Sequence, residues 1–254
     1  MMELVKLVNW LDEQLALKQF PGDHSNNGLQ VEGRSDVSLA VFGVDASQAL
    51  FDAAAEAHAD FIFVHHGLSW GGGLRRLTGA AAKRLATLFG SGISLYAAHL
   101  PLDAHPDFGN NAQLADMIGL KERVPFFEYD GRDIGFAGRL PEAAPGEEIA
   151  AYLGEKLDAD PVFYGDPRRR VTRIAVVSGG GGLDSLEAAA ACGCDLLVTG
   201  EFEHVMFHPR SESGIGVVAL GHYASETTGP RALMRKVGET WGLETRFIDI
   251  PTGL

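Results

Sequence analysis

Short, continuous apolar runs alternate with alanine-rich segments along most of the chain, and this alternation constrains the fold more than any other feature. The runs typical of strands are 37–44, 61–64, 93–98, 172–178, 195–199 and 215–220. The segments typical of helices are 47–58, 79–90, 110–118, 146–157, 183–193 and 226–241. Apolar strands that alternate with helices indicate a mainly parallel sheet with helices on both faces. The sequence therefore predicts an α/β fold.

The segment 120–170 departs from this alternation. It contains FFEYDGRDIGFAGRL, followed by prolines at 141, 145, 161 and 167. We expect a bridging region with some antiparallel strand pairing.

The chain also contains a degenerate repeat. Residues 37–67 align without gaps on 171–201, at an offset of 134, and both copies run strand, loop, alanine-rich helix, aspartate and apolar strand. This indicates a duplicated fold of two three-layer α/β lobes within one compact two-lobed domain. We expect the first lobe at about 1–125, the bridge at 126–170 and the second lobe at 171–254.

Polar residues recur at matching strand ends of the two copies. Segment 94–103 resembles 216–226 at an offset of 123, which matches His99 with His222 and Asp103 with Glu226. Two similar lobes facing one another would place these strand ends around a shared cleft. Open α/β sheets bind ligands at such ends, so we expect the functional site in this cleft.

Composition and charge exclude several classes of function. The chain has 254 residues and a formal net charge of −13, and its only basic run, Arg168 to Arg170, is typical of a solvated loop. General nucleic-acid binding is therefore not expected. No apolar stretch approaches the roughly 20 residues that span a bilayer, and the N-terminus does not resemble a signal peptide, so we expect a cytoplasmic protein. The two cysteines, Cys192 and Cys194, are expected to be structural.

Five residues at predicted strand ends carry metal-binding groups: His65, His66, Asp103, His222 and Glu226. Adjacent side chains on a strand point in opposite directions, but a turn after the strand would bring both histidines to one pocket. The alternative is that one histidine caps the strand and the other lies in the core. His222 and Glu226 are four residues apart, so they share one face if the segment is helical. A carboxylate can bridge two cations, which makes Glu226 the candidate bridge and Asp103 a terminal ligand.

The donor atoms limit which metals are expected. Nitrogen and oxygen ligands without thiolate suit zinc, manganese, iron, cobalt or nickel. Calcium is not expected with three imidazoles. The prediction is therefore two divalent transition-metal or zinc ions per chain.

Together, seven motifs make the sequence similar to one known family. They are DHSNNGLQVEG (23–33), GVDAS (43–47), FVHHGLSW (63–70), LYAAHLPLDAHPDFGNN (95–111), VVSGGGG (176–182), LVTGE (197–201) and GHYASE (221–226). The chain resembles the GTP cyclohydrolase 1 type 2 family, also described as dinuclear-metal-centre hexameric proteins, over essentially its whole length. The resemblance implies a duplicated α/β fold in compact form and a ring-shaped homohexamer.

The same resemblance implies the site. The family's metal ligands fall on His65, His66, Asp103, His222 and Glu226. It implies that His65 and His222 hold one cation, that His66 and Asp103 hold the other, and that Glu226 bridges them. It also implies a hydrolase that opens the imidazole ring of GTP with a metal-bound hydroxide. The alternative is a non-catalytic regulatory or scaffold hexamer whose metals hold the lobes together.

Other polar positions have two interpretations each. His99 matches His222 but has no metal role in the family pattern, so it is either a catalytic proton donor or a hydrogen-bonded structural histidine. Glu201 is either a cleft-facing residue or a solvated loop acid. The run Gly179–Gly182 could receive a phosphate on its amides, although it lacks the lysine of a P-loop. Asn26 and Asn27 precede Gly28 in a turn sequence that is typical of a structural role.

Overall fold

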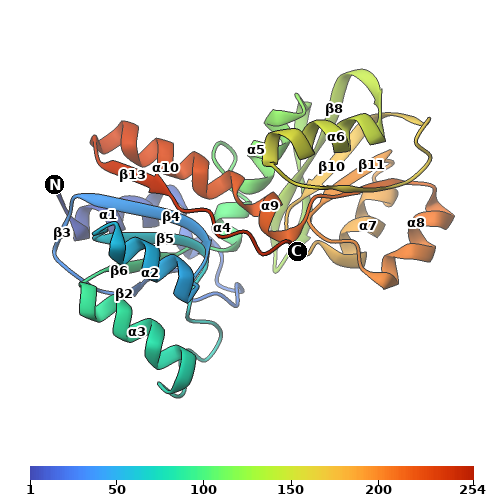
Figure 1. Cartoon of the computed structure of the whole chain (residues 1–254). Helices are drawn as coiled ribbons and strands as arrows, with labels where there is room; N and C mark the ends of the chain where they lie inside the picture. Colours follow the sequence, from blue (N-terminus) through green and yellow to red (C-terminus); the bar gives the residue numbers. More distant parts are fainter. The chain divides into compact units, whose positions relative to one another are not determined.

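The computed structural model describes residues 1–254, and the chain divides into two compact units. The first unit consists of Met1–Leu102 and Gly229–Ile250, and the second of Asp103–Thr228 and Pro251–Leu254. Residues 229–250, which the sequence grouped with the second lobe, lie in the first unit because the last strand of the chain pairs there (Figure 1).

The first unit is built on a five-stranded sheet with the order β13-β4-β5-β6-β2. Its strands are β2 (Gly28–Val31), β4 (Leu39–Asp45), β5 (Phe61–His66), β6 (Ser94–Ala97) and β13 (Glu244–Phe247). The first four in the sheet order are parallel, and β2 pairs antiparallel with β6. A separate antiparallel pair joins β1 (Met2–Glu3) to β3 (Asp36–Val37).

Helices cover both faces of this sheet. They are α1 (Leu4–Gln14), α2 (Gln48–Glu56), α3 (Gly79–Ser91) and α10 (Thr228–Trp241). Val41, Ile62 and Leu95 point from successive strands into a core shared with α2 and α3. The alternate positions carry aromatic rings; Tyr96 donates a hydrogen bond to Asp12 of α1, 2.8 Å away. This alternation is the two-residue period of a strand buried on both faces.

The second unit has a six-stranded sheet with the order β7-β8-β10-β11-β12-β9. Its strands are β7 (Lys121–Tyr129), β8 (Arg132–Pro145), β9 (Val162–Tyr164), β10 (Arg170–Val177), β11 (Leu196–Thr199) and β12 (Gly216–Ala219). Strands β10, β11 and β12 are parallel. The long hairpin β7-β8 and the short β9 are antiparallel to their neighbours, which confirms the antiparallel pairing predicted for the bridging region.

Helices again lie on both faces. They are α5 (Asn110–Met117), α6 (Gly146–Leu157), α7 (Gly182–Ala191) and α8 (Phe207–Ser213), and the short α9 (His222–Glu226) follows β12. The short α4 (Leu100–Asp103) follows β6 of the first unit, and only its last residue, Asp103, belongs to the second. Ile174 and Val198 pack with residues of α5 and α6. Val177 and Leu197 pack with residues of α7.

The two units share one core topology, so the predicted duplication is confirmed. The parallel trio β4-β5-β6 of the first unit corresponds to β10-β11-β12 of the second. In each unit an antiparallel edge strand, β2 or β9, pairs with the third strand of the trio. A short helix follows that third strand in both cases, α4 after β6 and α9 after β12. The matched His-x-x-x-acid pairs lie at these two helices.

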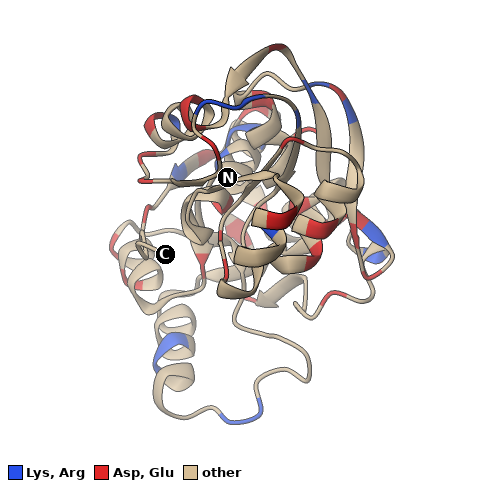
Figure 2. Ribbon diagram, turned by 90° about the vertical axis from the view of Figure 1, so that its right-hand side faces the viewer, with Lys and Arg blue, Asp and Glu red and all other residues tan.

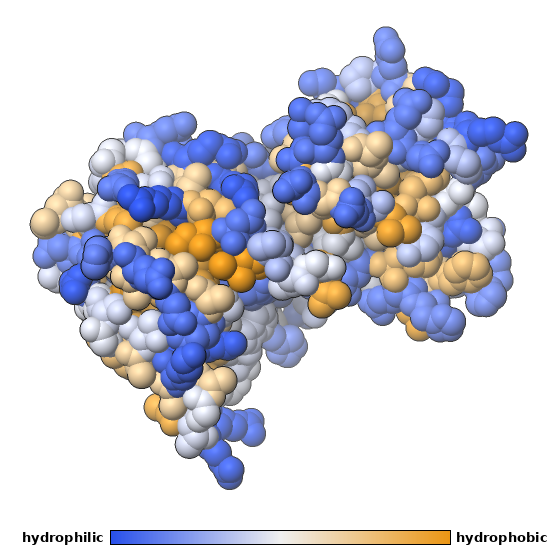
Figure 3. Space-filling model, viewed as in Figure 1, coloured by the Kyte–Doolittle hydropathy of each residue, from blue (hydrophilic) through white to orange (hydrophobic).

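Acidic positions are spread over many elements of the chain (Figure 2), as the net charge of −13 requires. The visible faces are largely hydrophilic, with local apolar patches (Figure 3). No helix combines the length and apolar character that crossing a membrane requires.

The cysteines give a test of the packing in the second unit. Cys194 is buried, and burial raises the pKa of its thiol to about 11, whereas Cys192 is exposed. Because the thiolate is the reactive form, iodoacetamide at pH 8 should alkylate Cys192 about 100-fold faster than Cys194 in the folded protein. Peptide mass spectrometry measures both rates. Equal rates would show that Cys194 is not packed as described.

Candidate metal centre

The end of β5 brings His65 and His66 to the carboxyl edge of the first sheet. Gly67 follows directly, and a side chain there would collide with the Gln30 amide and with Cβ of Ala97. Glycine at 67 therefore lets the backbone pass close to Gln30 and Ala97 directly after the histidine pair. His99 follows the neighbouring strand β6 at the same edge.

Three imidazoles of the first unit lie together at this edge. The ring centroids of His65 and His66 are 4.6 Å apart, and that of His99 lies 5.1 Å from His65 and 5.7 Å from His66. One ring nitrogen of each lies within 4.8 Å of the other two. Both His65 and His66 belong to β5, and their rings nevertheless lie close together. This trio is compatible with binding a metal ion.

Hydrogen bonds fix the tautomer of the histidine pair. His65 Nδ1 lies 2.9 Å from the carbonyl oxygen of Ala98, and His66 Nδ1 lies 2.8 Å from Asp45 Oδ1. A carbonyl or carboxylate oxygen only accepts, so Nδ1 donates in both rings. In the neutral imidazole the lone pair then belongs to Nε2, which is the usual arrangement of a metal-binding histidine.

A buried carboxylate holds His99 in the same way. His99 Nδ1 donates to Asp23 Oδ1 at 2.9 Å, and the backbone N–H of His99 donates to Asn27 Oδ1 at 2.9 Å. Burial alone would raise the pKa of Asp23, but hydrogen bonds from His99, Asn27 and the Ser25 amide hold it below its ordinary value. Asp23 is therefore ionised at neutral pH. Asn27 therefore has a structural role, which is to support His99.

The second unit contributes a histidine and a glutamate from α9. His222 Nε2 lies 3.3 Å from Glu226 Oε2, the one-face arrangement expected at a spacing of four residues. Glu226 is buried beside Gly179, where φ is +62° and a Cβ would collide with Glu226 Oε1. Glycine at 179 thus makes room for this carboxylate.

Glu201 is the outer partner of His222. Its Oε1 lies 2.6 Å from His222 Nδ1. The hydrogen bond with Glu226, together with a smaller contribution from Glu201, raises the pKa of His222 to about 9 against the opposing effect of burial. Two carboxylates on one imidazole produce a strongly negative field, which favours a cation. Glu201 therefore belongs to the polar cluster around His222.

Asp103 lies at the end of α4 in the second unit. A carboxylate oxygen of Asp103 lies within 4.8 Å of one of Glu226. Asp103 Oδ1 accepts hydrogen bonds from Asn110 Nδ2 at 2.9 Å and Ser178 Oγ at 3.1 Å. These neutral donors orient the carboxylate without neutralising its charge.

The glycine run after β10 does not favour an anion. Gly179 N donates to Ser225 Oγ at 2.9 Å, so this amide is already satisfied. Positions 179 and 180 face the carboxylates of Glu226 and Glu201. Because those groups repel a phosphate, the structure favours steric accommodation of Glu226 over phosphate binding.

The sequence did not reveal Asp23 and Asp45 as partners of the histidines. Asp45 pairs directly with His66 in the parallel ladder of β4 and β5. The position of Asp45, at the end of a predicted strand next to the strand that ends in histidines, could have indicated this contact. No sequence feature indicated the contact of Asp23, because 76 residues separate it from His99.

A duplicated α/β fold with imidazole and carboxylate groups at equivalent strand ends defines the class of protein. A profile of the Duf34/NIF3 (NGG1p interacting factor 3) family matches residues 2–253. A protein of Pyrococcus horikoshii named "GTP cyclohydrolase 1 type 2 homolog" is 46% identical over 254 residues, covering 100% of both chains. The chain belongs to the Duf34/NIF3 family.

Solved structures support the same assignment. Protein ybgI, described as of unknown function, matches with a TM-score of 0.92 and 38% identity, covering 100% of both chains. TTHA1606 from Thermus thermophilus matches with a TM-score of 0.88 and 40% identity, also over 100% of both chains.

The carboxylate partners of His66 and His222 give a prediction about metal affinity. Asp45→Asn and Glu201→Gln keep side-chain size but weaken the acceptor for Nδ1–H. Outer partners of this kind contribute about 10- to 100-fold in metal affinity, so each variant should bind zinc more weakly by that factor. Competition with a chromophoric chelator measures it, with Glu187→Gln, an exposed change on α7, as control. Wild-type affinity in both variants would contradict this role.

Proposed function

We propose that this protein is a dinuclear metal-dependent hydrolase that acts on the ring of a purine nucleotide. In this proposal His65, His66, Asp103, His222 and Glu226 bind two divalent cations. His65 and His222 would hold one cation, His66 and Asp103 would hold the other, and Glu226 would contribute to both. Support comes from the nitrogen and oxygen donors of each unit and from the name of the 46% identical relative.

The observation that carries the proposal is the hydrogen bonding of the histidines. Nδ1 of His65, His66 and His222 bonds an acceptor in every case, which leaves Nε2 of each ring as the atom that would bind a metal.

Each group in the proposed site has a separate role in the reaction. Two bound cations supply a water of lowered pKa and polarise the group that is attacked. Glu226 and Asp103 compensate the cationic charge. His99, held by Asp23, donates a proton from Nε2 to the departing ring nitrogen, and Asp23 stabilises the charged form of the imidazole. Asp45 and Glu201 keep the ligand rings in orientation.

The test is an assay of protein reconstituted with zinc or with manganese. GTP should release formate slowly, and the product should lose the ultraviolet absorption of the intact purine. Metal-free protein is the control. Absence of turnover on GTP, other nucleotides and cyclic amides, with both cations bound, would replace this proposal with a regulatory role.

The proposed assembly is a ring-shaped homohexamer, which rests on the family resemblance. Light scattering at micromolar concentration should give about six times the chain mass of 27.1 kDa. A monomer would rule out the ring.

A further inference from the structure

Trp70 is a partly exposed aromatic ring beside the histidines of the first unit. Its ring centroid lies 5.1 Å from that of His99, at an interplanar angle of 69°, and 6.1 Å from that of His66. The residue is 37% exposed. Burying a tryptophan is favourable, so a tryptophan kept at the surface next to polar chemistry needs an explanation.

Hydrogen bonds hold both the backbone and the side chain of Trp70 in place. Its indole Nε1 donates to the carbonyl oxygen of Gly67 at 2.8 Å, and Trp70 forms a bridge with Ser25. The neighbouring Ser69 N–H donates to Gln30 Oε1 at 3.0 Å, and Asn26 N donates to Ser69 O at 3.1 Å.

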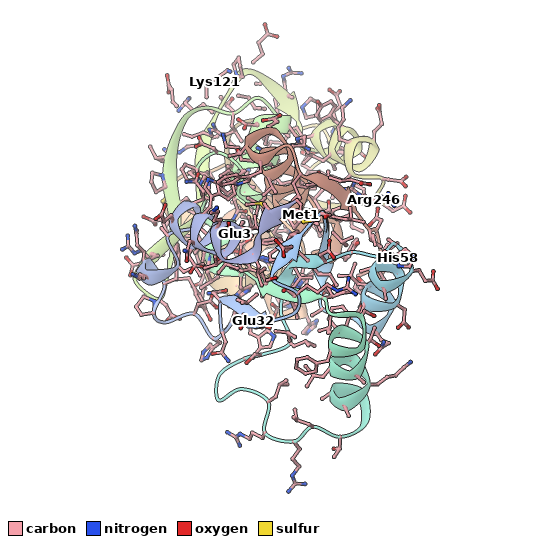
Figure 4. All side chains as sticks on the ribbon, turned by 90° about the vertical axis from the view of Figure 1, so that its left-hand side faces the viewer. Met1, Glu3, Glu32, His58, Lys121 and Arg246 are labelled. Carbon is pink, nitrogen blue, oxygen red and sulfur yellow. The ribbon has the colours of Figure 1, made fainter.

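The same segment that holds Trp70 also holds His99. Residues 23–30 provide Asp23 and Asn27 to His99 and Ser25, Asn26 and Gln30 to the Trp70 loop. The chain beyond Trp70 is different: residues 71–78 form an open loop before α3 (Figure 4). Trp70 therefore lies at the rigid base of this loop, in fixed relation to the proton-donating imidazole.

We propose that Trp70 is a stacking subsite for the planar heterocyclic ring of the substrate. A rigid indole loses little side-chain entropy when a ring stacks on it. Stacking on an aromatic side chain tolerates any planar base, so Trp70 would recognise ring character while the neighbouring groups select the atom that reacts. This inference rests on the proposed function and specifies how its substrate class is recognised.

Trp241 provides a matched control within the same unit. It is 40% exposed, close to the value for Trp70. Its ring packs edge-to-face on Trp10, with centroids 6.3 Å apart, and it belongs to α10. Trp241→Leu therefore removes an equally exposed indole without touching the histidines.

The experiment measures binding of GMP and of ribose 5-phosphate, which lacks the ring, to zinc-reconstituted full-length protein by calorimetry. Trp70→Leu should weaken GMP binding about 10-fold or more and leave ribose 5-phosphate binding unchanged. Trp70→Phe, which keeps a ring, should stay within about threefold of wild type. Trp241→Leu should bind both as wild type does. Zinc content and thermal melting show that each variant is folded.

Unchanged GMP binding by Trp70→Leu would overturn the proposal. So would an equal loss of both ligands, or no binding of GMP by the wild type. The binding result does not depend on turnover. Ring-dependent binding without hydrolysis would leave the subsite and remove the hydrolase. Hydrolysis by the wild type together with unchanged GMP binding by Trp70→Leu would leave the hydrolase and remove the subsite.

Discussion

Glu226→Gln is expected to remove at least one of the two cations that we propose for each chain. Glu226 is 3% exposed and lies 3.3 Å from His222 Nε2, so the amide keeps the shape of the side chain but removes a buried negative charge. As the proposed bridge, Glu226 contributes to both cations. The loss in affinity should exceed the roughly 100-fold upper value of an outer partner, and turnover should disappear with the metal.

Element analysis after reconstitution and dialysis measures this effect. Glu212→Gln, an exposed substitution on α8, controls for the general loss of one negative charge. His66→Ala should also lose metal and activity together. Retention of two cations by Glu226→Gln would remove Glu226 from the bridge.

His99→Asn is expected to reduce turnover by about 10²- to 10⁴-fold, the usual contribution of a general acid, while metal content stays at the wild-type level. Asparagine cannot donate a titratable proton. Asp23→Asn should lower turnover by a smaller factor, because the imidazole remains but loses the charge that orients it.

His58→Asn is the matched control for this series. His58 is exposed at the end of α2, where φ is +56°, a backbone conformation that asparagine tolerates (Figure 4). It should leave turnover unchanged. Wild-type turnover in His99→Asn would exclude His99 as the proton donor, and metal loss in that variant would instead make it a ligand.

The sequence predicted the elements of each core well, because continuous apolar strands and alanine-rich helices have strong local signals. The helix predicted at 146–157 coincides with α6 (Gly146–Leu157). The sequence missed β13, whose four residues are Glu-Thr-Arg-Phe. Such a mixed edge strand is defined by its partner β4, about 200 residues earlier in the chain, and local propensity cannot report a partner so distant.

In the candidate site, too, the sequence identified the features with local signals and missed those that depend on distant partners. Histidines and carboxylates at strand ends could be found from residue type and spacing alone. Their partners could not, because Asp23 and Glu201 reach His99 and His222 only through the fold. Gly179 also appeared to be part of a phosphate loop until its contact with Glu226 gave it a steric role.

The most direct test of the central claim is a crystal structure of the manganese-loaded protein with anomalous scattering recorded at the manganese edge. We expect two anomalous peaks in each chain, about 3.5–4 Å apart, with Glu226 contacting both. His65, His66, Asp103 and His222 should complete the ligand set. A single peak, or two peaks that share no ligand, would contradict a dinuclear centre.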